Sequence, residues 1–332
     1  MDSHVIEAAS VIISDNHWLI TSVVGSVLAF ILLRRIVAGG VCVSNKRLDG
    51  KTVIITGCNT GIGLETAKEL SARGARVIMA CRDMAKANKA SDIVKKFSGN
   101  TDVSVQRLDL ASLDSVRKFA DTINDNEERV DILINNAGLM LFSRLESDDG
   151  YEMQFAVNHL GHFLLTYLLL SKIKKSAPAR IINVSSNAHS KGKINFDDIN
   201  SKKDYSILTA YPQSKLANIL FTKELSRRLH GTGVTTYTLH PGVINTEISR
   251  YVKAWMTPPL FLFMRPFFIF LKTPVQGAQT TLHCALDENL DNVSGKYFSD
   301  CVQKQPSKAA LDMENAERLW RISEEMVAST VR

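Results

Sequence analysis

Beyond Lys51, short apolar runs rich in β-branched residues alternate with longer stretches of helical periodicity. The apolar runs are continuous, which is typical of strands covered by helices on both faces of a sheet. Strands that alternate with helices form parallel sheets with right-handed crossovers. The sequence therefore predicts an α/β protein with a doubly wound parallel sheet and strands over 52–56, 75–80, 103–109, 131–135, 180–185, 234–240 and 295–299.

Helices are expected between these strands. They cover 62–73, 84–97 and 112–126, followed by a long helix that ends near Tyr167 and a helix that contains Lys215. The 332 residues, 45% of them hydrophobic, provide enough core for one large domain or two small ones. Ligands of a doubly wound sheet bind beyond the carboxyl ends of the strands, so chemistry is expected at that edge.

The N-terminal segment differs in composition from the rest. Residues 16–33 carry no Lys, Arg, Asp or Glu, and Arg34 and Arg35 follow at once. A signal peptide would carry positive charge before the apolar run, and a mitochondrial presequence would be rich in Arg and poor in acids, whereas only acids precede this run. We expect a transmembrane anchor over 16–40, with a short non-cytosolic N-terminus over 1–15 and the remainder in the cytosol. The alternative is a buried N-terminal helix.

Charge and cysteine content exclude other classes. The formal charge of +6 is spread along the chain without a basic run interleaved with aromatics, so no nucleic-acid partner is expected. The cysteines have no metal-ligand spacing and are odd in number, which favours free thiols in a reducing compartment and no metal site; they are Cys42, Cys58, Cys81, Cys284 and Cys301.

A glycine-rich loop follows the first expected strand. In "TGCNTGIG", Gly57, Gly61 and Gly63 lie between that strand and the first helix. Glycine permits tight turns and close backbone approach to a phosphate, and the helix N-terminus offers free N–H groups. The position favours a dinucleotide site, and the alternative is a glycine-rich turn without a ligand.

The end of the second strand bears on which dinucleotide binds. An NAD site usually offers an acid to the ribose 2′-hydroxyl, whereas this chain has Arg82, which can pair with a 2′-phosphate. Asp83 is expected as the N-cap of the next helix. The pattern favours NADP(H), unless Arg82 is merely solvated surface.

"YPQSK" places Tyr211 and Lys215 four residues apart, on one face of the expected helix. A nearby cation favours the phenolate and lowers the pKa of the tyrosine, which allows proton exchange with a substrate oxygen. Thr209 is expected as the N-cap, which would place Pro212 in the first turn, where proline is tolerated.

With these motifs in order, and "NNAG" at 135–138 after the fourth strand, the chain resembles the short-chain dehydrogenase/reductase family over about residues 48–300. "NHLGHFLLT", "SKLANILF" and the stretch from "SGKYFSDC" to "AERLW" resemble its membrane-anchored retinol dehydrogenase/retinal reductase subfamily, which implies NADP(H). The resemblance implies a catalytic domain over 48–332, with an apolar lid over 253–273 and a helical tail over 307–328.

The resemblance also implies catalytic roles. Tyr211 would be the general acid/base, and Lys215 would lower its pKa and bind the nicotinamide ribose. Ser186 would hydrogen-bond the substrate oxygen, and Asn158 would hold a water that relays protons from Lys215. Two alternatives stay open: Ser185 as the catalytic hydroxyl, and Asn158 as a residue that only caps or kinks its helix.

The cofactor residues implied by the resemblance come from every loop at the same edge, with Asp109 meeting the adenine and Asn135 supporting the sheet rather than the ligand. They are Gly57, Asn59, Thr60, Gly61, Ile62, Gly63, Arg82, Asp109, Leu110, Asn136, Ala137, Gly138, Tyr211, Lys215, Pro241, Gly242 and Thr246.

A second apolar stretch, "PPLFLFMRPFFIFLK" at 258–272, is too short to span a bilayer and is interrupted by Arg265 and Pro266. It is expected either to pack over the substrate or to lie in the membrane interface. Ordinary core packing is the alternative.

These features predict an NADP(H)-dependent oxidoreductase that transfers hydride to or from an apolar alcohol or aldehyde. The resemblance implies retinol/retinaldehyde as the first candidate for the substrate. The alternatives are other lipid aldehydes, ketosteroids or a membrane-bound nucleotide-binding protein without turnover. The expected location is the endoplasmic reticulum membrane with the catalytic domain in the cytosol, or else a mitochondrial membrane. Oligomers are possible.

Overall fold

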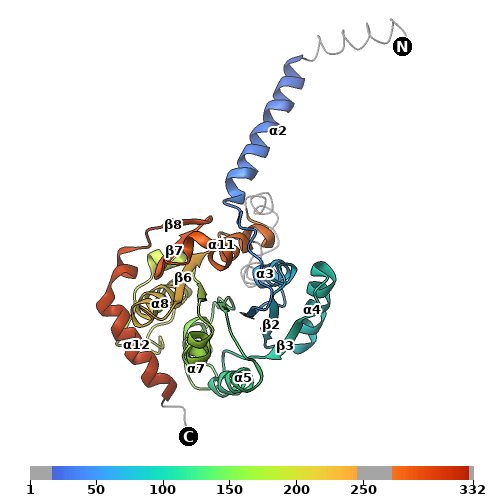
Figure 1. The fold of residues 1–332 in the computed structure, drawn as a ribbon. Coiled ribbons are helices and arrows are strands. Elements are labelled where there is room, and N and C mark those ends of the chain that lie inside the picture. The colour runs from blue at the N-terminus through green and yellow to red at the C-terminus, as the bar shows by residue number, and fades with distance from the viewer. Residues whose placement is uncertain (1–16, 245–270, 329–332) are drawn as a thin grey trace, which may run out of the picture.

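The structure is a computed structural model that describes residues 17–244 and 271–328 (Figure 1). Its centre is an eight-stranded sheet with the order β3-β2-β1-β4-β5-β6-β7-β8. Neighbouring strands from β3 to β7 are parallel, and β8 is antiparallel to β7. The strands are β1 Thr52–Thr56, β2 Arg76–Cys81, β3 Val103–Arg107, β4 Ile132–Asn135, β5 Ala179–Val184, β6 Val234–His240, β7 Lys296–Ser299 and β8 Val302–Lys304.

Helices cover both faces of this sheet, as predicted (Figure 1). The longer ones are α2 His17–Ala38, α3 Gly61–Ala72, α4 Met84–Ser98, α5 Leu113–Asn126, α7 Gly161–Lys175, α8 Ile207–Arg228, α11 Pro274–Leu286 and α12 Met313–Ala328. Shorter turns are α6 Met153–Phe155, the π-helix η1 Ala156–Leu160 and the 3₁₀ helices η2 Asn187–Lys191, η4 Glu288–Leu290 and η5 Lys308–Leu311.

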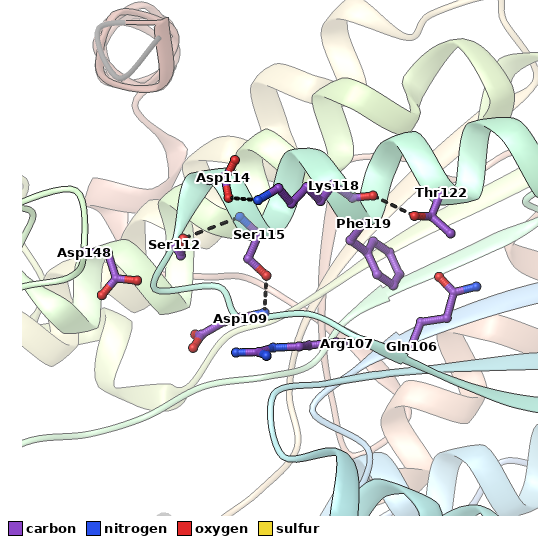
Figure 2. A pocket seen from close by; sticks show the side chains of 10 residues that line it. All are labelled: Gln106, Arg107, Asp109, Ser112, Asp114, Ser115, Lys118, Phe119, Thr122 and Asp148. Atoms are coloured by element: carbon purple, nitrogen blue, oxygen red, sulfur yellow. Dashed lines mark hydrogen bonds and ion pairs between the residues drawn. The ribbon is translucent and has the colours of Figure 1, made fainter. Parts of the chain in front are cut away.

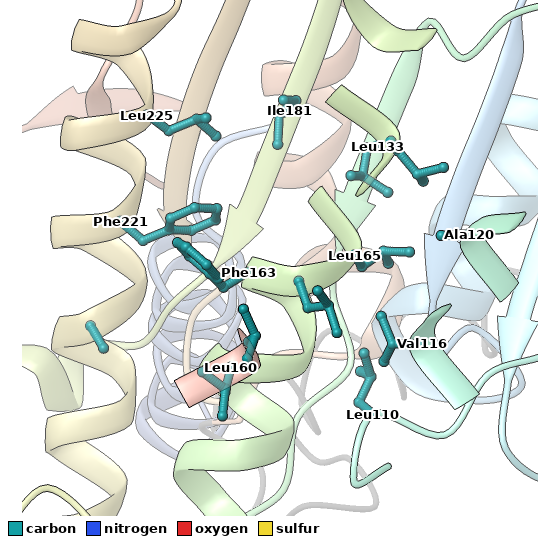
Figure 3. Packing of buried hydrophobic residues seen from close by; sticks show 14 of the residues in the cluster. Leu110, Val116, Ala120, Leu133, Leu160, Phe163, Leu165, Ile181, Phe221 and Leu225 are labelled. Carbon is teal, nitrogen blue, oxygen red and sulfur yellow. The ribbon is translucent and has the colours of Figure 1, made fainter. Parts of the chain in front are cut away.

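Alternate residues of each strand supply two hydrophobic layers. Ile54 and Leu133 point to the layer built by α5, α7, α8 and α12, part of which is drawn in Figure 3. Val53 and Ile55 point to the opposite layer, against α3, α4 and α11. Because both faces of a strand are buried, the runs read as continuously apolar in the sequence. The prediction of a doubly wound α/β sheet is confirmed.

The structure differs from the sequence prediction at α7, at β8 and at α11, a helix that was not predicted. The long helix continues to Lys175 instead of ending near Tyr167, because Leu169 and Ile173 extend its buried stripe past the half-exposed Tyr167. The edge strand β8 was not predicted; its three residues are all exposed and carry no apolar alternation.

Strand order reverses beside β1, because the chain steps from β1 outward to β2 and β3 and then returns to the other side of β1 as β4. Such a reversal opens a crevice at the carboxyl ends of the two neighbouring strands. The glycine-rich loop after β1 and the residues after β4 therefore lie at the place where this fold binds ligands.

Helix α2 stands away from the domain (Figure 1). Its segment Thr21–Ala38 has a mean hydropathy of 1.8, and none of these residues is buried against the rest of the protein. By length and composition the helix is able to cross a membrane. Uncovered apolar side chains over a whole helix need an apolar surrounding. The helix is thus a candidate membrane anchor.

A buried acid secures the opposite edge of the sheet. Asp131 accepts hydrogen bonds from Thr52 N at 2.9 Å, Lys51 Nζ at 3.0 Å and Arg129 Nε at 2.7 Å. Burial pushes the pKa of Asp131 upward, but these donors outweigh it and the pKa lies below its ordinary value. The carboxylate therefore stabilises the fold when it is ionised.

Replacing Asp131 with asparagine is expected to cost about 1–3 kcal/mol of unfolding free energy at neutral pH. Because the folded pKa is lowered, the contribution is present above the unfolded pKa and is lost as the pH falls through the folded pKa. Denaturant unfolding of the detergent-solubilised chain should show the wild-type advantage shrinking below about pH 4. Asp49→Asn, at an exposed pair with Arg47, is the control and should leave the unfolding midpoint nearly unchanged. A pH-independent difference would contradict the role of the ionised carboxylate.

Candidate active site

The loops after β1 and β4 form one continuous ledge. The Thr56 hydroxyl accepts hydrogen bonds from the backbone N–H of Asn136 at 3.0 Å and of Ala137 at 2.9 Å. The Asn136 side chain donates back to the carbonyls of Thr56 and Gly57, at 2.8 and 3.2 Å. The predicted cofactor residues Gly57, Asn136 and Ala137 are thus in direct contact.

The glycines of the loop after β1 are packed so closely that a side chain would not fit. Gly57 has φ +64°, and a Cβ there would lie 2.8 Å from the Ala137 Cβ. A Cβ on Gly63 would lie 2.6 Å from Asn136 Nδ2. Thr60 is the N-cap of α3, but its side chain makes no capping hydrogen bond and does not satisfy the N–H groups of the first turn. Close-packed glycines and an uncapped helix N-terminus fit a dinucleotide pyrophosphate.

Arg82 follows β2 at the same edge and is exposed. Within residues 17–244 and 271–328 it has neither an ion pair nor a hydrogen bond. Asp83 next to it is the N-cap of α4, as predicted, and accepts from Lys86 N at 3.0 Å. The acid is therefore engaged by its own helix, and the arginine is available to an anion.

A pocket of about 670 Å³ flanks the end of β3 and the first half of α5 (Figure 2). Asp109 lies at this pocket, where its carboxylate accepts from Ala111 N at 3.0 Å. The neighbouring Leu110 side chain is instead buried in the hydrophobic layer of Figure 3, so only its main chain can meet a ligand. Asn59 is half-buried in the glycine loop.

Helix α8 carries the pair Tyr211 and Lys215, but it begins earlier than expected. Its N-cap is Ser206, which accepts from Leu208 N at 3.2 Å, and not Thr209. Pro212 consequently lies inside the helix rather than in its first turn. Proline lacks the N–H that would bond to the Leu208 carbonyl, and the exposed Leu208 can leave that carbonyl to water.

Tyr211 and Lys215 face the end of β5. The ammonium of Lys215 lies 5.8 Å from the centroid of the Tyr211 ring and donates to the Val184 carbonyl at 3.2 Å. Burial lowers the pKa of Lys215 to about 8. Burial also raises the pKa of Tyr211, against a hydrogen bond with Ser186 that lowers it. In the protein alone, burial thus outweighs the depression expected from Lys215, and the tyrosine is held as a protonated phenol.

The two serines after β5 have different environments. Ser185 Oγ donates to the Lys215 carbonyl at 2.6 Å and is thereby committed to the backbone of α8. Ser186 caps η2, where its hydroxyl accepts from Ala188 N at 3.2 Å, and it also bonds to Tyr211. Of the two hydroxyls, only that of Ser186 touches Tyr211.

Asn158 lies buried in the π-helix η1. Its side-chain amide bonds to both backbone groups of Leu139, at 2.8 and 3.0 Å, and donates to Ser214 Oγ at 2.9 Å. A Cβ on Gly138 would lie 3.2 Å from Lys215 Nζ and 3.3 Å from Asn158 Oδ1. Four predicted site residues, Gly138, Asn158, Tyr211 and Lys215, are therefore gathered at one point.

Two histidines, His162 and His189, support this cluster. His162 bonds to the Asn158 carbonyl through Nδ1 at 3.2 Å and to Thr56 Oγ1 through Nε2 at 2.8 Å. Burial lowers the pKa of His162 to about 3, so the ring stays neutral. The signal was available: in "NHLGH" the second His lies four residues after Asn158, on the same helical face.

His189 supports the turn that carries Ser186. Its Nε2 accepts from Ser307 N at 3.2 Å, which requires Nδ1 to carry the proton donated to the Ser186 carbonyl at 2.7 Å. One imidazole tautomer thus joins the Ser186 turn to the C-terminal tail.

The described start of the loop after β6 lies at the carboxyl edge of the sheet. Pro241 is buried, and Gly242 has φ +98°, where a Cβ would lie 2.5 Å from Lys272 Cδ. Thr246 and residues 258–270 of the second apolar stretch lie outside the described residues.

The family described as short chain dehydrogenase matches residues 51–257 of this chain. Together with the doubly wound sheet and the Tyr–Lys pair at its carboxyl edge, this match defines the class. The chain belongs to the short-chain dehydrogenase family, and it is an oxidoreductase that uses a nicotinamide dinucleotide.

Individual proteins of this family are similar to the chain over most of its length. The chain is 52% identical to human "Retinol dehydrogenase 12" over 295 residues, which covers 89% of this chain and 92% of the relative. It is 52% identical to mouse "Retinol dehydrogenase 13" over 309 residues, which covers 92% of each chain. Among solved structures, an uncharacterised protein of Mycobacterium paratuberculosis is 36% identical with a TM-score of 0.68, covering 87% of this chain and 98% of that one.

A further similar solved structure is a complex with NADP. The Pseudomonas aeruginosa protein RhlG in complex with NADP is 25% identical to this chain with a TM-score of 0.62. The match covers 76% of this chain and 95% of that one.

Proposed function

We propose that the protein is an NADP(H)-dependent retinol dehydrogenase/retinal reductase that acts on a retinoid dissolved in the membrane. The observation that carries this proposal is the cluster of Ser186, Tyr211, Lys215 and Asn158, in which Lys215 and Asn158 lie beside Gly138. The likeness to retinol dehydrogenases supports the substrate class.

In this proposal the catalytic residues move a proton while the cofactor, when bound, exchanges a hydride with the substrate carbonyl carbon. Ser186 Oγ and the Tyr211 hydroxyl would both hold the carbonyl oxygen, and Tyr211 would donate its proton to that oxygen in reduction. The pKa of Lys215, about 8, suits proton exchange near neutral pH. Lys215 would reprotonate Tyr211, with Asn158 holding a relay water.

The predicted cofactor residues would bind the dinucleotide along the carboxyl edge of the sheet. The loop with Gly57, Asn59, Thr60, Gly61, Ile62 and Gly63 would hold the pyrophosphate, and Asp109 with the main chain of Leu110 would hold the adenine. The middle of the dinucleotide would be lined by Asn136, Ala137 and Gly138. The nicotinamide amide would be positioned by Pro241, Gly242 and Thr246. Arg82, exposed and without a partner in residues 17–244 and 271–328, would bind the 2′-phosphate.

The anchor and the free cysteines support a proposed location. Arg34 and Arg35 end α2 on the side of the catalytic domain, and the cysteines are all free, which supports a cytosolic domain. We place the protein in the endoplasmic reticulum membrane, with a mitochondrial membrane as the alternative.

A substrate panel tests the function. Full-length protein in phospholipid vesicles should reduce retinaldehyde with NADPH faster than with NADH, and faster than it reduces other lipid aldehydes or ketosteroids. Consumption of NADPH is followed at its absorbance band, and products are identified by chromatography. A preference for a ketosteroid would contradict the substrate assignment, and a preference for NADH would contradict the cofactor assignment.

A further inference from the structure

The turn between β7 and β8 has an unfavourable backbone. Asp300 and Cys301 are its two residues, and both have positive φ, +56° and +58°. Two-residue hairpin turns of this kind favour Asn-Gly or Gly-Gly, because other side chains crowd the backbone. Such a conformation persists when surrounding contacts hold it. Here Asp300 receives Lys272 Nζ at 2.6 Å and Lys304 Nζ at 3.1 Å, and Cys301 N donates to Thr280 Oγ1 at 3.3 Å.

The end of α2 lies against this turn. Gly39 has φ +72°, and a Cβ there would lie 2.5 Å from Lys272 Nζ. A Cβ on Gly40 would collide with the backbone carbonyl of Asp300. Side chains are excluded from both positions, so the two glycines allow the end of the anchor to pack directly on the catalytic domain.

Further bonds fasten the chain on either side of the two glycines. Arg34 Nη1 donates to the Leu271 carbonyl at 3.2 Å, and Cys42 N donates to Gln279 Oε1 at 3.0 Å. Ser44 Oγ donates to the carbonyl of Leu286 at 3.2 Å. The anchor is therefore joined to α11 and its surroundings over residues 34–44, and it is not a free tether.

Lys272 also reaches the candidate active site. Its side chain packs on Gly242, and its backbone N–H donates to the Val243 carbonyl at 2.9 Å. Gly242 and Val243 follow β6 at the carboxyl edge of the sheet, where the proposed function has the nicotinamide bind. One buried lysine thus contacts the end of the anchor, the β7–β8 turn and the mouth of the site.

Apolar side chains around these contacts are exposed. Val243 is 67% exposed and Val275 52% exposed, and Val275 lies one helical turn before Gln279, which bonds to Cys42. On the anchor side, Ile36 is 69% and Val41 65% exposed. This apolar surface continues from the uncovered face of α2, which itself requires lipid, so the bilayer is the partner that fits it.

We propose that Gly39, Gly40, Lys272 and Asp300 form an anchor clamp, which holds the mouth of the active site against the bilayer so that apolar substrate enters from the lipid. The inference rests on the proposed function, because it assigns the route by which a membrane-dissolved carbonyl compound reaches Tyr211.

Gly40→Val tests the clamp in the full-length protein reconstituted in vesicles. The added side chain should displace the anchor from Asp300 and leave the catalytic residues in place. We expect kcat/KM for retinaldehyde dissolved in the bilayer to fall roughly tenfold or more, because the local substrate supply is lost. With a short water-soluble aldehyde, kcat/KM should be unchanged, as should KM for NADPH.

Gly25→Val is the matched control. It places the same side chain within α2 at a position where a Cβ meets nothing within 4 Å, and it should retain wild-type activity on both substrates. Equal activity of Gly40→Val and wild type on the bilayer substrate would overturn the clamp. A wild type inactive on retinaldehyde would overturn the proposed function instead.

A second measurement does not depend on catalysis. A fluorescent amino acid in place of Val275 should be quenched by spin-labelled lipid in the wild-type background and much less in Gly40→Val. The same probe in place of Phe97, which is exposed on α4, should not be quenched in either background. Absence of lipid quenching at position 275 in the wild-type background would overturn the proposed bilayer contact.

Discussion

Tyr211→Phe is expected to lower kcat for carbonyl reduction by about 10²–10⁴-fold, the usual range for loss of a general acid. The ring that packs near Lys215 remains, but the hydroxyl that would donate the proton is removed, together with its bond to Ser186. Binding of NADPH should be retained, because the glycine loop and Arg82 are untouched. Stopped-flow single turnovers and cofactor fluorescence titrations separate the two effects.

Tyr167→Phe serves as the control, since Tyr167 is half-exposed on α7 and has no role in the proposed mechanism. It should turn over at the wild-type rate. A Tyr211→Phe variant with near wild-type kcat would remove Tyr211 from the proton transfer, while a variant that no longer binds NADPH would indicate a damaged fold rather than a lost acid.

Arg82→Ala is expected to raise KM for NADPH and to leave KM for NADH nearly unchanged. One charge-assisted contact to a 2′-phosphate is worth about 1.5–3 kcal/mol, which corresponds to roughly 10- to 150-fold in affinity. Arg82 is open to this contact because Asp83 is engaged as the N-cap of α4 and does not pair with the arginine. Steady-state kinetics with both cofactors measure the change.

Arg107→Ala is a demanding control, because Arg107 ends the neighbouring strand β3 and is also exposed. The substitution removes the same charge as Arg82→Ala. A much smaller effect there would identify a specific contact at Arg82. Equal losses in both variants would mean that the NADPH preference comes from the general positive potential of this edge, and a parallel loss with NADH would contradict the phosphate role.

The sheet and its switch point could be predicted because apolar runs, glycines and helical periodicity are local signals. The motifs then located Gly57, Asn158, Tyr211 and Lys215 at one edge, since parallel strands bring all their carboxyl ends together. The Asp83 cap was also readable, from a single acid before a helix.

Features that depend on contacts between distant segments could not be predicted. Ser206 rather than Thr209 caps α8 because both can cap and only the packing of the preceding loop decides between them. The raised pKa of Tyr211 follows from burial by the fold, which a spacing of four residues does not reveal. Lys272 was assigned to an apolar stretch, yet it is the residue that contacts Gly39, Gly242 and Asp300.

The reaction proposed for the Tyr211 site is hydride transfer between NADP(H) and a retinoid carbonyl. It is tested most directly by incubating the full-length protein in vesicles with retinaldehyde and NADPH that carries deuterium at both hydrogens of the nicotinamide C4 atom, followed by mass spectrometry of the retinoid. The proposed function predicts retinol that carries one deuterium on the former carbonyl carbon, formed by the wild type and almost absent with Tyr211→Phe. Unlabelled retinol, or no retinol from a wild-type protein that binds NADPH, would contradict it.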